Sequence, residues 1–139
     1  MKEIYKNKVR NLPHEEWKQF STIYYVSNKG RVKSRKLLKN GQILERLLKQ
    51  FDNGNGYLTF KISENGKRKN IRTNRAVAIA FIPNDDPNNK TVVNHKDENK
   101  QNNNSVNLEW LSFAENNSYG TRIKRMIETR KKNKELKAA

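Results

Sequence analysis

The chain has 139 residues, and its 30 Lys and Arg against 14 Asp and Glu give a formal net charge of +16. This length supports one compact body with smaller satellite parts, and the charge excess calls for a polyanionic partner, either nucleic acid or an anionic membrane surface. The longest apolar run, residues 76–83, is far shorter than a bilayer span, which excludes a membrane-spanning role.

The N-terminal segment, residues 1–20, is basic at its start and lacks the apolar stretch of a secretory signal. This predicts an intracellular, cytoplasmic protein. Further along, Pro13 and the acidic pair at 15–16 favour a short turn of helix. Trp17 and Phe20 would then face inward, so that the segment covers a sheet.

Residues 24–34 contain two β-rich pieces separated by Asn-Lys-Gly, which predicts a hairpin with Gly30 at positive φ. The second piece carries Arg31, Lys33 and Arg35 at a period of two. On a strand, this spacing places the three cations on one face and Val32 on the other. The hairpin is therefore expected to have a basic edge.

Further strands are expected around residues 39–50 and 56–63, and the turn at 65–66 should open another strand over 67–73. Residues 1–73 would then form a small antiparallel β module with basic tips. A two-stranded ribbon fits the major groove of a duplex, so this module is the candidate for base contacts. Its last strand offers Arg68, Lys69 and Arg72 for that purpose.

From Asn74 the apolar period changes to that of a helix, which Pro83 closes. Residues 91–95 and 108–111 predict two short strands around a polar loop, and a helix should begin at or just after Ser112. Residues 74–120 thus form a ββα unit. Residues 121–139 are expected to be a basic helical tail, so the fold class is α+β.

The ββα unit contains candidates for phosphodiester hydrolysis, which needs a base for water and a cation for the developing charge. His95 ends the first strand, Asn94 precedes it, and Asn116 lies on the following helix. At the strand end, where the backbone turns, Asn94 and His95 can both approach one phosphate. Two amide oxygens with phosphate and water make an octahedral shell suited to Mg²⁺, and the absence of cysteine removes thiolate zinc sites.

Several stretches of the chain carry a family resemblance. Residues 94–100, 102–103, 107–110 and 115–117 closely resemble the HNH homing endonucleases found in phage introns and intergenic regions. Residues 75–83 are similar to the helix and loop before that family's site. Residues 16–34 resemble the small module that commonly precedes such nucleases. The resemblance covers most of residues 14–117.

The resemblance implies a metal-dependent endonuclease that acts on double-stranded DNA, with His95 as general base, Asn94 and Asn116 as ligands of Mg²⁺ or Mn²⁺, and Asn107 as a structural residue of the loop. A monomer is expected, and its single site would nick one strand, so that cutting both needs a dimer or a second event. Candidates for DNA contact are Arg31, Lys33, Arg35, Arg68, Lys69, Arg72, Arg75, Lys96, Arg122, Lys124 and Arg125.

Two departures from the family pattern keep alternatives open. Many relatives have Asp at the position of Asn94, and an amide contributes no charge to a cation. The helix before the loop usually opens with His-Arg, where this chain has Asn74 and Arg75. The first alternative is a catalytically weak or inactive DNA-binding protein with the HNH fold. The second is an RNA-binding intron accessory protein, although the sequence shows no aromatic cluster that would stack on single-stranded bases.

Overall fold

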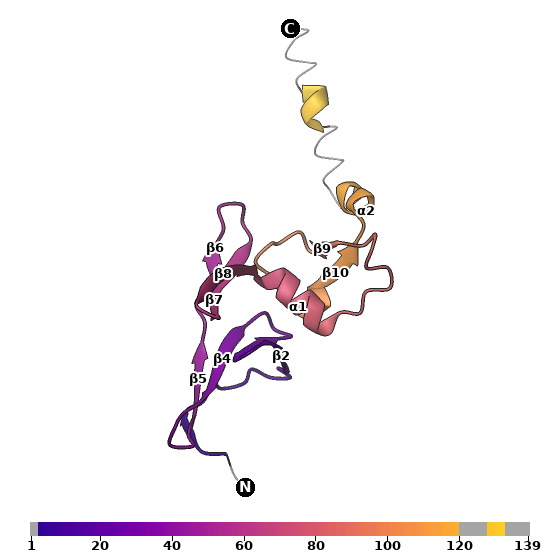
Figure 1. Cartoon of the computed structure of the whole chain (residues 1–139). Helices are drawn as coiled ribbons and strands as arrows, with labels where there is room; N and C mark the ends of the chain where they lie inside the picture. The colour runs from indigo at the N-terminus through magenta and orange to yellow at the C-terminus, as the bar shows by residue number, and fades with distance from the viewer. Residues whose placement is uncertain (1–2, 120–127, 133–139) are drawn as a thin grey trace.

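The chain is described by a computed structural model, which defines residues 3–119 and 128–132. In this part of the chain the fold is α+β, as the sequence predicts, with strands dominating and grouped in three separate sheets. Figure 1 shows α1, Thr73–Phe81, between the N-terminal sheets and the short hairpin of β9 and β10. This helix is therefore the central element around which the other parts are arranged.

The first sheet has five strands in the order β1-β5-β4-β3-β2. Their bounds are Tyr5–Asn7 for β1, Trp17–Ser21 for β2, Tyr24–Ser27 for β3, Val32–Leu37 for β4 and Ile43–Leu47 for β5. Strand β1 pairs with β5 in parallel, and the remaining pairs are antiparallel. The predicted hairpin around Gly30 is confirmed, with φ of 82° at that glycine.

The expected turn of helix over residues 13–20 is wrong, because Trp17 begins strand β2, which pairs antiparallel with β3. The acidic residues that suggested a helix start serve another purpose. The carboxylate of Glu15 accepts the backbone N–H of Leu12 and binds the guanidinium of Arg31. Pairing with a neighbouring strand has outweighed the local helix signal.

The second sheet has three strands in the order β6-β7-β8. It consists of β6 (Phe51–Asp52), β7 (Leu58–Glu64) and β8 (Lys67–Arg72). Asn65 and Gly66 join the last two strands with φ of 51° and 73°, which is the positive-φ turn that the dipeptide predicts. The strands predicted in this region are present.

The ββα unit is also present. Strand β9 (Val92–His95) pairs antiparallel with β10 (Leu108–Leu111), and a 3₁₀ turn, η1 (Ser105–Asn107), precedes β10. Helix α2 (Phe113–Ser118) follows, and Ser112 caps it through a capping box with Glu115. The cap explains why the helix begins directly after the strand.

The hydrophobic core is shared by all of these parts. Val26 of β3, Phe60 of β7, Val77 of α1, Val93 of β9 and Leu108 of β10 belong to one buried cluster. The core thus crosses the boundary expected between residues 73 and 74. The division into 1–73, 74–120 and 121–139 stays a prediction, and the first two segments bury their apolar side chains together.

In the C-terminal segment, residues 128–132 are helical. Arg122, Lys124 and Arg125, which were expected to contact DNA, lie outside the described residues. Within residues 3–119 and 128–132, neither length nor apolar character equips a helix to cross a lipid bilayer.

Candidate active site

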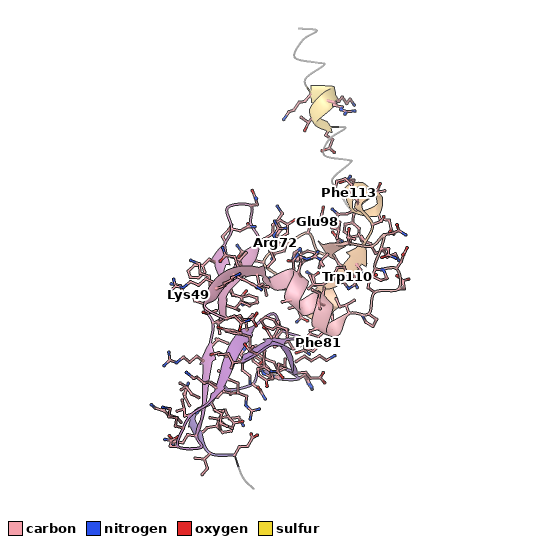
Figure 2. All side chains as sticks on the ribbon, viewed as in Figure 1. Lys49, Arg72, Phe81, Glu98, Trp110 and Phe113 are labelled. Atoms are coloured by element: carbon pink, nitrogen blue, oxygen red, sulfur yellow. The ribbon has the colours of Figure 1, made fainter. Side chains whose placement is uncertain are left out.

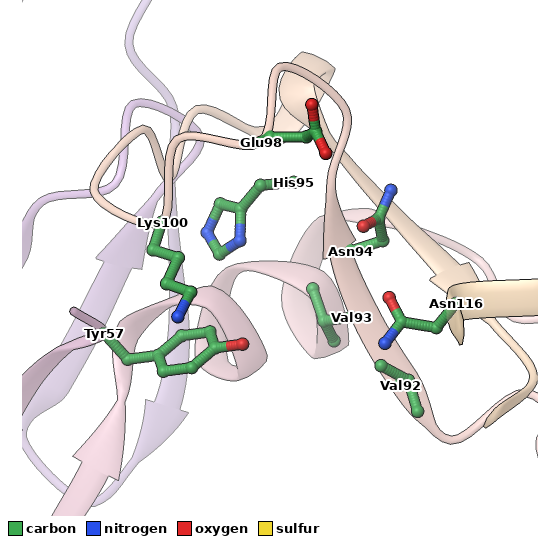
Figure 3. Close-up of a pocket in the computed structure, with 8 residues that line it drawn as sticks. All are labelled: Tyr57, Val92, Val93, Asn94, His95, Glu98, Lys100 and Asn116. Carbon is green, nitrogen blue, oxygen red and sulfur yellow. The ribbon is translucent and has the colours of Figure 1, made fainter. Parts of the chain in front are cut away.

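One pocket, with a volume of about 260 Å³, brings the three predicted site residues together: His95, Asn94 and Asn116. In the view of Figure 3, Asn94 and Asn116 lie at one end, Tyr57 and Lys100 lie at the other, and His95 lies between them. Strand β9, helix α2 and the residue that precedes β7 therefore all contribute side chains to the same site.

The pairing of β9 with β10 positions the two central residues. His95 lies opposite Leu108 and Asn94 lies opposite Glu109 in the register of the hairpin. His95 and Asn94 are both buried, at 5% relative exposure each. The amide of Asn94 donates a hydrogen bond of 3.1 Å from Nδ2 to Oε1 of Glu109. Asn94 is thus held by its cross-strand neighbour.

The imidazole of His95 is held by one strong hydrogen bond. Its Nε2 lies 2.7 Å from Oδ1 of Asn103. An amide oxygen only accepts, so Nε2 carries the proton in the neutral ring and Nδ1 keeps a lone pair that can take one. Burial lowers the pKa of His95 below its ordinary value, and the nearby cation of Lys100 acts in the same direction. The hydrogen bond that His95 donates to Asn103 and the charge of Asp97 oppose this shift.

The loop between the strands is braced by Asn107. Its side-chain amide donates to Oδ1 of Asp97 and to the carbonyl of Asn102, and its Oδ1 accepts the backbone N–H of Asp97. These bonds join the start of the loop to its end. The geometry around Asn107 is that of a residue that shapes the loop which carries Asn103.

The donor set of the pocket suits a hard cation. Asn94 and Asn116 offer amide oxygens, and the carboxylate of Glu98 lines the same pocket. Oxygen ligands in small number, with water completing the shell, are what Mg²⁺ and Mn²⁺ accept. Among the described residues there is no group of three or more His, Asp or Glu that could hold a metal without amides. A divalent ion is therefore compatible with the pocket through its asparagines.

The pocket is also lined by three residues that the sequence reasoning did not single out, Tyr57, Glu98 and Lys100, and a fourth, Asn103, binds His95. Lys100 donates from Nζ to the carbonyl of Asn55, at 2.9 Å, and lies over the ring of Tyr57. Lys100 is inside the stretch that carries the family resemblance, which was a usable signal. Tyr57 lies in a different segment, and nothing in its local sequence places it beside His95.

The three cations expected on the edge of the first hairpin are engaged with carboxylates. Arg31 binds Glu15, Lys33 binds Glu45 at 2.9 Å, and Arg35 binds Glu3 at 2.8 Å. Lys33 is only 8% exposed. Val32 lies on the opposite, core-facing side, as the period of two predicts. DNA contact by these three residues stays a prediction, and their pairing within the protein argues against it.

The other basic candidates among residues 3–119 are exposed. Arg68 and Lys69 lie on β8, and Lys96 follows β9 directly. Arg72, labelled in Figure 2 where β8 runs into α1, stacks over the ring of Tyr57. Arg75 donates to the carbonyl of Thr91 and lies over the ring of Trp110. Because Tyr57 lines the pocket, Arg72 brings the positive charge of β8 to the edge of the site.

The chain matches known proteins over most of its length. Residues 15–63 match the NUMOD4 motif. An uncharacterized HNH endonuclease of Acanthamoeba polyphaga mimivirus is 38% identical over 103 residues, which are 73% of this chain and 28% of that protein. The DNA endonuclease I-HmuI of Bacillus phage SP01 is 36% identical over 100 residues, 70% of this chain and 52% of that protein. The chain therefore spans about a quarter to a half of these relatives.

A solved structure supports the same relationship. The structure described as DNA binding and cleavage by the HNH homing endonuclease I-HmuI superposes with a TM-score of 0.58 and 31% sequence identity. The match covers 84% of this chain and 68% of that chain. The likeness thus extends over most of this chain.

Proposed function

This chain belongs to the family of HNH homing endonucleases, and from that premise we propose that it is a metal-dependent endonuclease that hydrolyses a phosphodiester of double-stranded DNA. The observation that carries the proposal is the shared pocket of His95, Asn94 and Asn116. It combines a neutral imidazole with oxygen ligands for a cation, which are the two groups that this hydrolysis requires.

His95 is the general base of the proposed reaction. Asn103 holds Nε2 as the protonated nitrogen, which leaves Nδ1 to accept the proton of a water molecule. Burial keeps the ring neutral near pH 7 because it disfavours the imidazolium. The fixed orientation matters as much as the pKa, since a general base works only within hydrogen-bond reach of the proton it takes.

Asn94 and Asn116 would hold a divalent ion, Mg²⁺ or Mn²⁺. Such an ion, when bound, supplies positive charge for the phosphate and for the oxygen that leaves. Lys100 adds a second positive charge to the same pocket, where it lines the wall opposite the two asparagines. The exposed cations Arg68, Lys69 and Arg72 would hold the phosphates of the duplex next to this pocket.

The stoichiometry of cutting follows from the single ββα unit. One chain has one His95 and one pair of asparagines, so a monomer would nick one strand, and a double-strand cut would need a dimer or a second event. The competing proposal is a DNA-binding protein with weak or no catalysis, and it rests on the neutral side chain of Asn94. RNA binding ranks third, because the pocket and the family both favour DNA hydrolysis.

The deciding experiment is nicking of supercoiled plasmid by the full chain with Mg²⁺, with Mn²⁺ and with chelator. Replacing His95 by Ala should lower the rate about 10²- to 10⁴-fold, which is the usual contribution of a general base. His14, the other histidine of the chain, is exposed and serves as the control. His14→Asn suits its φ of 59° and should cut like the wild type. DNA binding without metal-dependent nicking would favour the inactive alternative.

A further inference from the structure

We propose that Glu109 is the positioning residue that makes Asn94 a cation ligand and that supplies the negative charge which Asn94 lacks. This inference rests on the proposed metal site. It starts from the hydrogen bond of 3.1 Å between Nδ2 of Asn94 and Oε1 of Glu109. The two residues are direct cross-strand neighbours in the β9–β10 hairpin, so their side chains lie on the same face.

The hydrogen bond between Asn94 and Glu109 determines which end of the Asn94 amide is available to a cation. A carboxylate has only acceptors, so the NH₂ group of Asn94 must face Glu109. The opposite rotamer would place the amide oxygen against the carboxylate oxygen at hydrogen-bond distance, where they repel each other. With Nδ2 held in this way, Oδ1 is the atom that Asn94 can offer to a cation in the pocket it lines. Asn94 is buried, which leaves its amide little freedom to turn.

The bond also places a charge behind the ligand. Hydrogen bonds to an ionised acceptor are stronger than neutral ones, and they shift electron density toward the far oxygen of the amide. Partners of this kind behind a metal ligand typically change metal affinity about 10- to 100-fold. Glu109 is half-buried, so solvent screens its charge less than that of a surface carboxylate. Asn94 and Glu109 together therefore supply the oxygen ligand and part of the negative charge that one aspartate would supply.

Asn94→Asp is expected to gain little affinity for a cation in the wild-type background. In the wild-type background, the new carboxylate would face Glu109 at the distance that now holds a hydrogen bond, and like charges so close repel each other. Asn94→Asp should therefore gain little affinity while Glu109 is charged. With Glu109→Gln beside it, the aspartate can accept a hydrogen bond from the glutamine amide. The two substitutions are expected to compensate each other in a double-mutant cycle.

The experiment is Mn²⁺ binding to the full chain without DNA, measured by isothermal titration calorimetry and by electron paramagnetic resonance of free Mn²⁺. Glu109→Gln should weaken binding about 10-fold or more, because charge is lost while an acceptor remains, and Glu109→Ala should weaken it further. Glu16→Gln removes the same charge at an exposed position outside the pocket and should bind like the wild type. Circular dichroism melting of each variant checks that the fold is retained.

The outcomes separate the two proposals. If the wild type binds Mn²⁺ and Asn94→Ala does not, the metal site stands. An unchanged affinity in Glu109→Gln and Glu109→Ala would then overturn the role of Glu109 alone. Additive effects of Asn94→Asp and Glu109→Gln would contradict the coupling between them. If wild type and Asn94→Ala bind Mn²⁺ equally weakly, the metal site itself is overturned, and with it the role of Glu109.

Discussion

Strands β4 and β8 both carry alternating cations, but these cations meet different surroundings. On β4, Lys33 and Arg35 lie near the carboxylate of Glu45, which is 2% exposed. On β8, Arg68 and Arg72 are exposed, and their cross-strand partners are Ser63 and Thr59. The charges of Lys33 and Arg35 are therefore compensated within the protein, while those of Arg68 and Arg72 are available to a polyanion.

The difference comes from the neighbouring strand. Strand β5 places Glu45 opposite Arg35, and the carboxylate of Glu45 is buried there. Its Oε1 accepts the backbone N–H of Val9, so both oxygens of Glu45 are used. The lesson is that a period-two run of cations identifies a strand face but does not identify its partner. The partner is decided by the residues that the next strand brings opposite.

The largest effect is expected from Glu45→Ala. It leaves Lys33 buried without its carboxylate, and breaking a buried pair in this way typically costs about 3–5 kcal/mol. Urea denaturation should show this loss in the free energy of unfolding. Glu64→Ala, at the end of β7, is the control, and a partly exposed carboxylate there should change stability by about 1 kcal/mol or less. Equal losses of unfolding free energy in both variants would mean that the pairing of the β4 cations with Glu45 has no special weight.

The next effect concerns the β3–β4 turn, where the first sheet reaches the site. Gly30 has φ of 82°, and a Cβ there would lie 3.0 Å from Cβ and from the carbonyl oxygen of Asn103. Gly30→Ala should displace the residue that holds His95 and should lower the nicking rate about tenfold or more, together with about 1–3 kcal/mol of stability.

Gly41→Ala is the matched control for that variant. Gly41 has almost the same φ, 84°, but a Cβ there meets nothing within 4 Å. It carries the same backbone strain and should leave the nicking rate of the folded protein unchanged. A comparable loss of rate in Gly41→Ala would show that strain alone, and no contact with Asn103, explains the effect.

A smaller effect is expected in the salt dependence of DNA binding. Replacing Arg68 or Arg72 by Ala should weaken binding and lower the slope of log affinity against log salt by about 1 each, because each phosphate contact releases counterions. Lys33→Met should leave the slope unchanged if the charge of β4 is already used by Glu45. Fluorescence anisotropy over a salt series measures both. A reduced slope in Lys33→Met would restore β4 as a DNA-contacting strand.

The smallest effect is expected in the pH dependence of the nicking rate. Only the neutral imidazole of His95 can act as a base, so nicking should be full above its pKa and fall as the pH drops through it. Burial and Lys100 both lower this pKa, so the acidic midpoint should lie below the ordinary value of 6.5. Lys100→Met removes one of these causes and should move the midpoint upward. An unchanged midpoint would mean that the rate reports a different group.

Much of the fold and of the site was readable from the residues. Periodicity indicated α1, the Asn65-Gly66 turn indicated the β7–β8 hairpin, and Ser112 marked the start of α2. The ordered family motifs placed His95, Asn94 and Asn116 in one site, and the structure brings these three into one pocket. These features depend on near neighbours in the chain, which is why local patterns suffice for them.

Other features required the tertiary structure. The segment around Trp17 became a strand because β3 was there to pair with it, against its local helix signal. Tyr57 reaches the pocket from the turn before β7, and Glu45 of β5 pairs with Lys33 and Arg35 of β4. Glu109 faces Asn94 only through the register of β9 with β10. Each of these contacts joins residues distant in the chain, and their meeting is decided by strand pairing and by the shared core, which no local pattern encodes.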